Sequence, residues 1–214
     1  MINKHISRLC NILKNPLLYY YILFNRAKLY LKDIEFGSRL KIFNSIYISK
    51  HKNSKIIIGD NFVFSSGGCY NPLCRNIKGS IYTSENAQIV IGNNVGISSA
   101  VIWCSDEIRI GDNTLIGGDC ILLDTDAHSL DYEIRNGVKL TKDGCSLDYI
   151  MAKKAPIIIE NDVLIGTRCI ILKGVTIGAR SVIAAGSVVT KSIPCDCIAG
   201  GNPCKVLKKA NNGW

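Results

Sequence analysis

The chain has 214 residues, of which 47% are hydrophobic and 20% charged, and its formal net charge is +9. This length and composition are typical of one ordered domain and exclude a disordered chain. A nucleic-acid-binding module would interleave basic residues with aromatic ones, whereas here the lysines gather near the two ends of the chain. The charge therefore favours a polyanionic small molecule or an anionic surface as partner, and no nucleic acid is predicted.

Residues 1–35 carry no repeat, and their apolar residues fall at helical spacing. The apolar run 17–24 is far shorter than the roughly 20 residues that a membrane-spanning helix needs. One interpretation is a helical cap over the open end of a repeat array. The other is an interfacial helix on an anionic membrane, because Lys14, Arg26, Lys28 and Lys32 flank the run. No signal peptide is evident.

A repeat of six residues dominates the chain after Phe36, irregular at first and strict from residue 156 to 191. An aliphatic side chain returns at every sixth position: Ile159, Ile165, Ile171, Ile177, Ile183 and Val189. Six is a multiple of two but not of 3.6, so the pattern excludes an amphipathic helix and fits short strands. Repeats of this kind predict a parallel β-helix. The phase slips near Trp103, which predicts a bulge or a widened corner there.

The regular repeat stops after Leu123 and returns at Ile157, which leaves an insertion at about residues 129–156. Insertions in repeat proteins lie on one face, which is often the functional one. At its start, Asp124, Asp126 and His128 alternate, so on an extended strand they would share one face. Because imidazole changes its charge near neutral pH, His128 is the candidate general base.

Two other chemistries are conceivable in this segment. Two carboxylates and an imidazole can hold a divalent ion, but a structural zinc site would need more sulfur or histidine ligands. We predict no metal and expect one of the two aspartates to orient His128. Cys145 also lies in the insertion, but no base is coupled to it in the sequence. The ten cysteines are expected to be reduced and, like Cys169 in the repeat, to serve as small apolar residues.

Four motifs resemble the hexapeptide-repeat acyltransferases, in the branch that holds the galactoside, maltose and xenobiotic acetyltransferases. They are IENDVLIGT (159–167), KGVTIG (173–178), AGSVVTK (185–191) and GNPCKVL (201–207). The resemblance extends over roughly residues 56–209. It implies an all-β, left-handed parallel β-helix over residues 36–209, with residues 1–35 as cap and 210–214 as tail. Pro203 to Ala210 is predicted to form a short C-terminal helix.

The resemblance also implies an activity. By this resemblance, the protein is expected to be an acetyl-CoA-dependent O-acetyltransferase that transfers an acetyl group directly to a hydroxyl of a carbohydrate or similar acceptor. His128 matches the family's histidine and Arg135 its loop arginine, whereas the usual proline after the histidine is Ser129 here. We expect Arg135, Asp126 and Asp124 to contact the acceptor. The alternatives are an N-acetyltransferase on an amino sugar and a non-catalytic trimeric β-helix scaffold.

Coenzyme A carries several negative charges, and the resemblance assigns residues to it: Thr167, Ala185 and Thr190 along the pantetheine arm, with Lys191 and Lys208 near the phosphates. The family tryptophan at position 164 is leucine here. The resemblance further implies a cytoplasmic homotrimer with sites between subunits. Outward aliphatic residues such as Val182 and Val188 would favour burial against a second prism.

Overall fold

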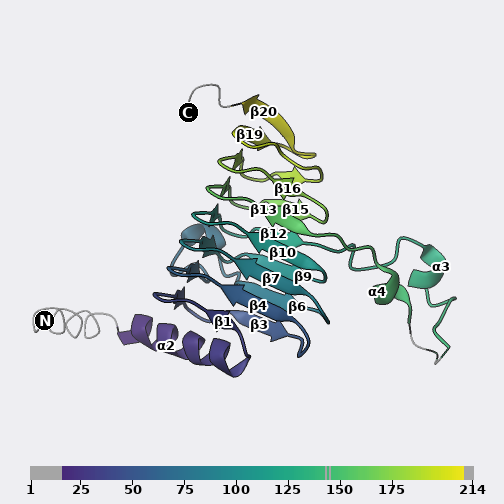
Figure 1. The fold of residues 1–214 in the computed structure, drawn as a ribbon, viewed down its shortest axis with the longest axis horizontal. Helices are drawn as coiled ribbons and strands as arrows, with labels where there is room; N and C mark the ends of the chain where they lie inside the picture. The colour runs from purple at the N-terminus through teal and green to yellow at the C-terminus, as the bar shows by residue number, and fades with distance from the viewer. Residues whose placement is uncertain (1–15, 143, 145, 210–214) are drawn as a thin grey trace, which may run out of the picture.

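The computed structural model describes residues 16–142, 144 and 146–209. The chain forms the expected left-handed parallel β-helix, a three-sided prism of stacked coils (Figure 1). The first sheet holds β1 (Glu35–Phe36), β4 (Lys55–Ile58), β7 (Gln88–Ile91), β10 (Glu107–Ile110), β13 (Ile157–Ile159) and β16 (Thr176–Ile177). The second holds β2 (Lys41–Phe43), β5 (Val63–Ser65), β8 (Gly96–Ser98), β11 (Leu115–Ile116), β14 (Leu164–Ile165), β17 (Val182–Ile183), β19 (Cys197–Gly200) and β20 (Lys205–Lys209). The third holds β3 (Tyr47–Lys50), β6 (Ser80–Thr83), β9 (Val101–Cys104), β12 (Ile121–Leu123), β15 (Ile170–Leu172) and β18 (Val188–Val189).

The six-residue period sets the size of a coil. In the regular part, Ile158 pairs with Thr176 and Ile170 with Val188, so one coil takes 18 residues, or three hexads. Near Trp103 the coils are longer: Val101 pairs with Ile121, 20 residues later. The pairing of β9 with both neighbours continues without a register shift, so the predicted slip is a lengthened strand and corner and not a bulge.

The interior of the prism is a column of aliphatic side chains. The repeated residues Ile159, Ile165, Ile171, Ile177, Ile183 and Val189 are each at most 1% exposed. Successive side chains of a strand point to opposite faces, so every second residue enters this column and its neighbours face outward. Burial of each such side chain contributes about 1.5–3 kcal/mol relative to exposure, which makes the axis the main source of stability.

One corner of the prism is closed by a ladder of amides. Asn61, Asn94, Asn113 and Asp162 all adopt left-handed backbone angles, with φ between 57° and 60°. Asparagine and aspartate tolerate this conformation better than other residues with a Cβ. Their side chains also bond from coil to coil, Asn61 to Asn94 at 2.7 Å, Asn94 to Asn113 at 2.9 Å and Asn113 to Asp162 at 2.9 Å.

Helix α2 (Pro16–Leu31) lies across the first coil and covers that end of the interior (Figure 1). Its residues Asn25 and Leu29 are fully buried on the side that faces the coil. The Asn25 amide donates to the carbonyls of Ile42 and Asn44, at 3.2 and 2.8 Å. The cap expected from the sequence is thus present in α2, while residues 1–15 lie outside the described part. Within that part, no helix has the length and apolarity needed to cross a bilayer.

The predicted C-terminal helix is wrong. Lys205–Lys209 forms strand β20, which pairs antiparallel with β19. The reason is the open edge of the last coil: without β20, the backbone groups of β19 on that side would lack a strand partner. The hairpin supplies one, although every side chain of β20 stays exposed.

The insertion projects from the prism as an arm, which we define as residues 124–156 (Figure 1). It begins about five residues earlier than the sequence suggested, directly after β12. It contains the short helices α3 (Tyr132–Arg135) and α4 (Asp148–Met151), and a 3-10 turn, η1 (Pro72–Cys74), lies in a separate loop. At the base of the arm the two chain segments run side by side, with Thr125 opposite Lys154.

Candidate active site

His128 lies near the base of the arm with 69% of its side chain exposed. Its Nδ1 is 2.6 Å from Oδ2 of Asp148, the first residue of α4. The other oxygen of Asp148 accepts the backbone N–H of Ser129 at 2.7 Å. An ionised carboxylate can only accept, so Nδ1 carries the proton and Nε2 keeps its lone pair. This tautomer is the one that a general base needs.

The hydrogen bond from His128 lowers the pKa of Asp148, and the Ser129 N–H lowers it further. The positive charge of Arg135 acts in the same direction. Asp148 is therefore ionised at neutral pH. A carboxylate in this position orients the imidazole and stabilises the imidazolium that forms when His128 takes a proton.

Asp148 is a candidate functional residue that the sequence analysis missed. We expected Asp124 or Asp126 to orient His128, and the structure shows neither in that role. Asp148 is twenty residues further along the chain, and no repeat or motif marks it. Only the fold of the arm, which returns α4 to the histidine loop, reveals the pair.

Asp124 is fully buried, so its predicted contact with an acceptor is wrong. Its carboxylate accepts the backbone N–H groups of Ser105 at 2.6 Å and Asp106 at 2.8 Å. Burial raises the pKa of Asp124, while these hydrogen bonds act against that effect. Asp124 therefore links two neighbouring coils at a corner. Its oxygens pair with backbone N–H groups that would otherwise lack an acceptor.

Asp126 anchors the histidine loop. Its Oδ1 pairs with Nζ of Lys173, just beyond β15, and its backbone carbonyl accepts the N–H of His128 at 2.7 Å. Its Oδ2 is buried and has no hydrogen-bond partner among the described residues. A buried acceptor without a partner is unusual and marks a position where a further donor would be favoured. Contact with an acceptor stays a prediction for this residue.

Arg135 in α3 donates from Nη1 to the carbonyl of Ser129 at 2.7 Å. It therefore holds the loop that follows His128. The rest of its guanidinium is exposed, and contact with an acceptor stays a prediction.

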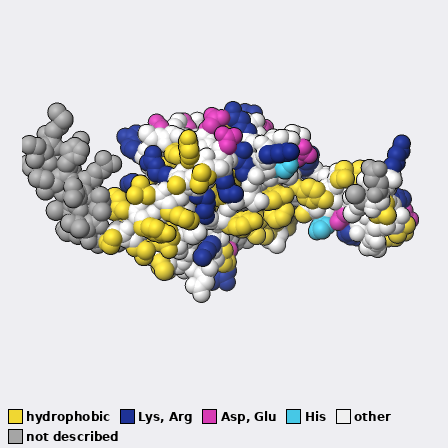
Figure 2. All heavy atoms as spheres, turned by 90° about the horizontal axis from the view of Figure 1, so that it is seen from below, with side chains coloured by type: hydrophobic (Ala, Val, Ile, Leu, Met, Phe, Trp, Pro, Cys, Tyr) yellow, Lys and Arg dark blue, Asp and Glu magenta, His cyan; other side chains and the backbone are white. Residues whose placement is uncertain are grey.

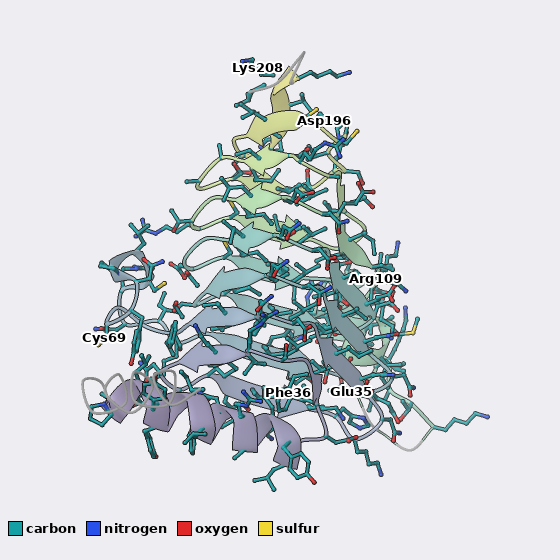
Figure 3. The ribbon with its side chains drawn as sticks, turned by 60° about the vertical axis from the view of Figure 1, so that its left-hand side comes forward. Glu35, Phe36, Cys69, Arg109, Asp196 and Lys208 are labelled. Carbon is teal, nitrogen blue, oxygen red and sulfur yellow. The ribbon has the colours of Figure 1, made fainter. Side chains whose placement is uncertain are left out.

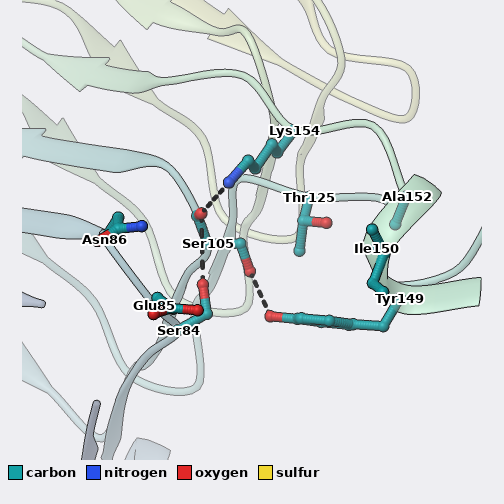
Figure 4. Close-up of a pocket in the computed structure, with 9 residues that line it drawn as sticks. All are labelled: Ser84, Glu85, Asn86, Ser105, Thr125, Tyr149, Ile150, Ala152 and Lys154. Atoms are coloured by element: carbon teal, nitrogen blue, oxygen red, sulfur yellow. Dashed lines mark hydrogen bonds between the residues drawn. The ribbon is translucent and has the colours of Figure 1, made fainter. Parts of the chain in front are cut away.

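A pocket of about 320 Å³ opens between the arm and the corner of the prism (Figure 4). Its lining is rich in hydroxyl and amide groups: Ser84, Glu85, Asn86, Ser105, Thr125, Tyr149, Ile150, Ala152 and Lys154. Tyr149 Oη lies 3.1 Å from Oγ of Ser105, and Lys154 Nζ donates to the Ser105 carbonyl at 3.0 Å. Tyr149 follows Asp148 in α4, so one helical turn supplies both a side chain that lines the pocket and the carboxylate that contacts His128.

The residues predicted to bind coenzyme A fall at separate places on the prism. Thr167 and Ala185 follow β14 and β17 at one corner, where a Cβ on Gly166 would lie only 2.5 Å from the Ala185 nitrogen. The two coils approach so closely at this corner that position 166 has no room for a side chain, and the corner is narrow. Thr190 and Lys191 follow β18 at the corner that bears the arm, and both are exposed.

Lys208 lies on β20 at the far end of the prism from Phe36 (Figure 3). Within one chain, the fold therefore does not gather the five predicted residues around His128. Among the described residues there is no cluster of three or more side chains suited to a metal ion. The eight described cysteines are free thiols, Cys169 is fully buried as expected, and Cys145 lies outside the described residues.

The family model for the hexapeptide repeat of succinyl-transferase matches residues 107–123 and 156–191. Galactoside O-acetyltransferase of Escherichia coli K12 is 36% identical over 137 residues, which are 64% of this chain and 61% of that protein. A solved galactoside acetyltransferase in complex with coenzyme A covers 92% of this chain and 79% of its own, with 28% identity and a TM-score of 0.56. The chain thus contains the hexapeptide repeat and is similar to acetyltransferases that share it.

Other members of the acyltransferase fold are more distant. The S84A variant of AntD, an N-acyltransferase from Bacillus cereus in complex with dTDP-4-amino-4,6-dideoxyglucose and coenzyme A, has a TM-score of 0.60 at 16% identity. It covers 87% of this chain and 90% of its own, and it supports the β-helix fold alone. The match to the E. coli relative leaves more than a third of that protein uncovered.

Proposed function

We propose that the protein is an acetyl-CoA-dependent O-acetyltransferase that acts on a hydroxyl of a carbohydrate or similar acceptor. The His128–Asp148 pair carries the proposal, because a neutral imidazole held by a carboxylate is the group that this transfer requires. The match to the hexapeptide repeat and the similarity to a galactoside acetyltransferase in complex with coenzyme A support it.

In the proposed mechanism both substrates are bound together and no acyl-enzyme forms. Nε2 of His128 removes the acceptor's hydroxyl proton as its oxygen attacks the thioester carbonyl carbon. The tetrahedral intermediate collapses, the C–S bond breaks, and the imidazolium returns the proton to the leaving thiolate. Asp148 remains ionised and stabilises the imidazolium throughout. Holding the two substrates in line supplies much of the rate.

The pocket beside α4 supports a hydroxylated acceptor. Its lining offers Ser84, Glu85 and Asn86 as hydrogen-bonding groups and the ring of Tyr149 as an apolar surface. Specific small-molecule sites combine apolar surface with a few placed polar groups in this way. In the proposal, Asp126 contacts the acceptor from the loop that leads to His128, and Arg135 contacts it from α3.

The proposed coenzyme A contacts are Thr167, Ala185, Thr190, Lys191 and Lys208. Because they fall at two corners and one end of the prism, we propose that the site is completed between chains, in a homotrimer. Leu115 and Leu164 lie side by side on the outer face of the second sheet, with exposures of 54% and 44%. Burial of this apolar face against another prism would stabilise the assembly. The proposed location is the cytoplasm, with peripheral membrane contact through the N-terminal segment.

The deciding test is an acceptor screen with radiolabelled acetyl-CoA that offers sugars with free hydroxyls and matching amino sugars side by side. We expect acetyl transfer to hydroxyls, a loss of about 10²–10⁴-fold in His128→Ala, and unchanged acetyl-CoA binding by that variant. Preferential transfer to amines would replace O- by N-acetylation. Full activity of His128→Ala would refute the mechanism, and absence of coenzyme A binding would favour a non-catalytic scaffold.

A further inference from the structure

The outer face of α2 is apolar along its whole length. Its exposed large side chains recur three and four residues apart, with exposures between 41% and 82%: Leu17, Tyr20, Leu23, Phe24, Tyr30 and Leu31. The opposite face carries Asn25 and Leu29, which are buried on the first coil. Figure 2, seen from this end of the prism, shows hydrophobic side chains gathered here with basic ones beside them. An exposed helix face that is apolar, with basic residues beside it, is typical of a helix that lies in a membrane interface.

Cations surround this face. The sequence of α2 has no acidic residue, and a groove of about 430 Å³ lies between the helix and the first coils. Arg26, Arg39 and Lys41 line the groove together with apolar side chains such as Ile22 and Val63. None of the three forms an ion pair with a described residue, although other cations of the chain do. Three like charges without an ion-pair partner among the described residues favour an anion as occupant.

The neighbouring side chain of Lys28 shows the same imbalance. Its Nζ donates to the Ile46 carbonyl at 2.9 Å, and burial together with the charge of Lys32 lowers its pKa. Lys28 therefore forms no ion pair with a described residue, whereas Lys50 and Lys55 of the first coils pair with Asp33 and Glu35.

We propose that this end of the prism docks on an anionic phospholipid bilayer, with the outer face of α2 at the acyl boundary and the groove of Arg26, Arg39 and Lys41 taking lipid phosphates. A helix of 16 residues is about 24 Å long, too short to span but suited to lie in the interface. Tyrosines such as Tyr20 and Tyr30 are favoured at that depth, where the ring is apolar and the hydroxyl wet. The inference rests on the proposed peripheral location and is independent of acetyl transfer.

The test is co-sedimentation of the full chain with vesicles of phosphatidylcholine alone and with 30% phosphatidylglycerol. We expect binding to the anionic vesicles only, weakened by salt because exposed charges are screened. Each cation near an anionic surface strengthens binding about fivefold, so R39Q with K41Q should weaken it about 25-fold. The variant L23S with F24S, which removes exposed apolar surface, should weaken it at least tenfold.

The matched control is K205Q with K209Q on β20, which removes the same charge from the opposite end of the prism and should change binding less than twofold. Equal loss in this control would show that net charge alone acts, and the proposal would fail. The proposal would also fail if the wild-type chain did not bind anionic vesicles. It would fail as well if L23S with F24S changed the oligomeric state and left vesicle binding unchanged. Acetyl transfer to a soluble acceptor should be unchanged in every variant, so failure here leaves the proposed reaction intact.

Discussion

At the scale of single residues, the proposed chemistry depends on one contact between two side chains that are distant in sequence. His128 is the only histidine of the arm, and Asp148 accepts hydrogen bonds both from its Nδ1–H and from the Ser129 N–H. The same carboxylate thus sets the tautomer of the base and the shape of its loop. Changes at Asp148 should separate these effects from substrate binding.

The first prediction concerns the charge of Asp148. In Asp148→Asn the side chain keeps its size but loses its negative charge, so the imidazolium is less stabilised and the tautomer is no longer fixed. We expect kcat to fall roughly 10²-fold while the KM for acetyl-CoA changes little. Asp131→Asn is the matched control, because Asp131 caps α3 in the same arm. A kcat loss in the control as large as that in Asp148→Asn would show that the arm is merely disturbed.

The second prediction concerns pH. The hydrogen bonds from His128 and Ser129 lower the pKa of Asp148, so its stabilisation of the loop is full above the ordinary carboxyl range. It is lost as the pH falls through the lowered pKa of the folded state. Hydrogen exchange of the Ser129 amide, corrected for its intrinsic rate, should therefore quicken below about pH 4. The dependence should vanish in Asp148→Asn, whereas amides of the core such as Ile165 should not follow it.

At the scale of elements, the corners of the prism contribute to the stability and the register of the coils as much as the strands do. The amide ladder from Asn61 to Asp162 combines backbone angles that most residues avoid with bonds between coils. The strands themselves are only two to four residues long in the coils, so they could not hold their register alone.

The third prediction is a pair of changes in this ladder. Asn94→Ala loses both side-chain hydrogen bonds. It also places alanine, which has no polar side chain to offset the strain, at φ 57°, and this costs about 1–2 kcal/mol for the backbone alone. Asn94→Gly loses the same bonds but accepts the angle freely. Chemical denaturation should therefore rank wild type above the glycine variant and the glycine variant above the alanine variant. Equal midpoints for the two variants would show that the angle contributes nothing.

The elements also show the limits of sequence reasoning. The hexads predicted the strands, their inward residues and the place of the arm, because alternation is local and the buried residue recurs at a fixed interval. The end of the chain was misjudged: Lys205–Lys209 has helical composition but forms a strand, because the free edge of β19 outweighs a weak local preference.

At the scale of the whole molecule, the prism has two exposed apolar regions that we assign to different partners. The outer face of the second sheet, with Leu115 and Leu164, is assigned to another copy of the chain. The outer face of α2 is assigned to lipid. The second region is assigned to lipid because Arg26, Arg39 and Lys41, which form no ion pair with a described residue, line a groove beside it.

The fourth prediction separates the two regions. Leu164→Glu places a charge in the proposed contact between prisms, so sedimentation should show a shift from three chains to one. Tyr30→Glu, at 78% exposure on α2, should leave the oligomeric state unchanged. Transfer activity should fall with the first change because the proposed site is completed between chains. A trimer that survives Leu164→Glu would move the interface to another face.

The sequence by itself determined the β-helix, its apolar axis, the break in the repeat and the candidate base His128. The first three follow from periodicity, which is a property of neighbouring residues and needs no knowledge of distant contacts. His128 was chosen for its place at the end of the repeat, the chemistry of imidazole and the family resemblance. The tertiary structure alone decided that Asp148 and not Asp124 faces the imidazole, that Asp124 is buried in a corner, and that Thr167 and Lys191 occupy different corners. Those outcomes depend on how the arm folds back and how the coils stack, and such contacts join residues that no local pattern connects.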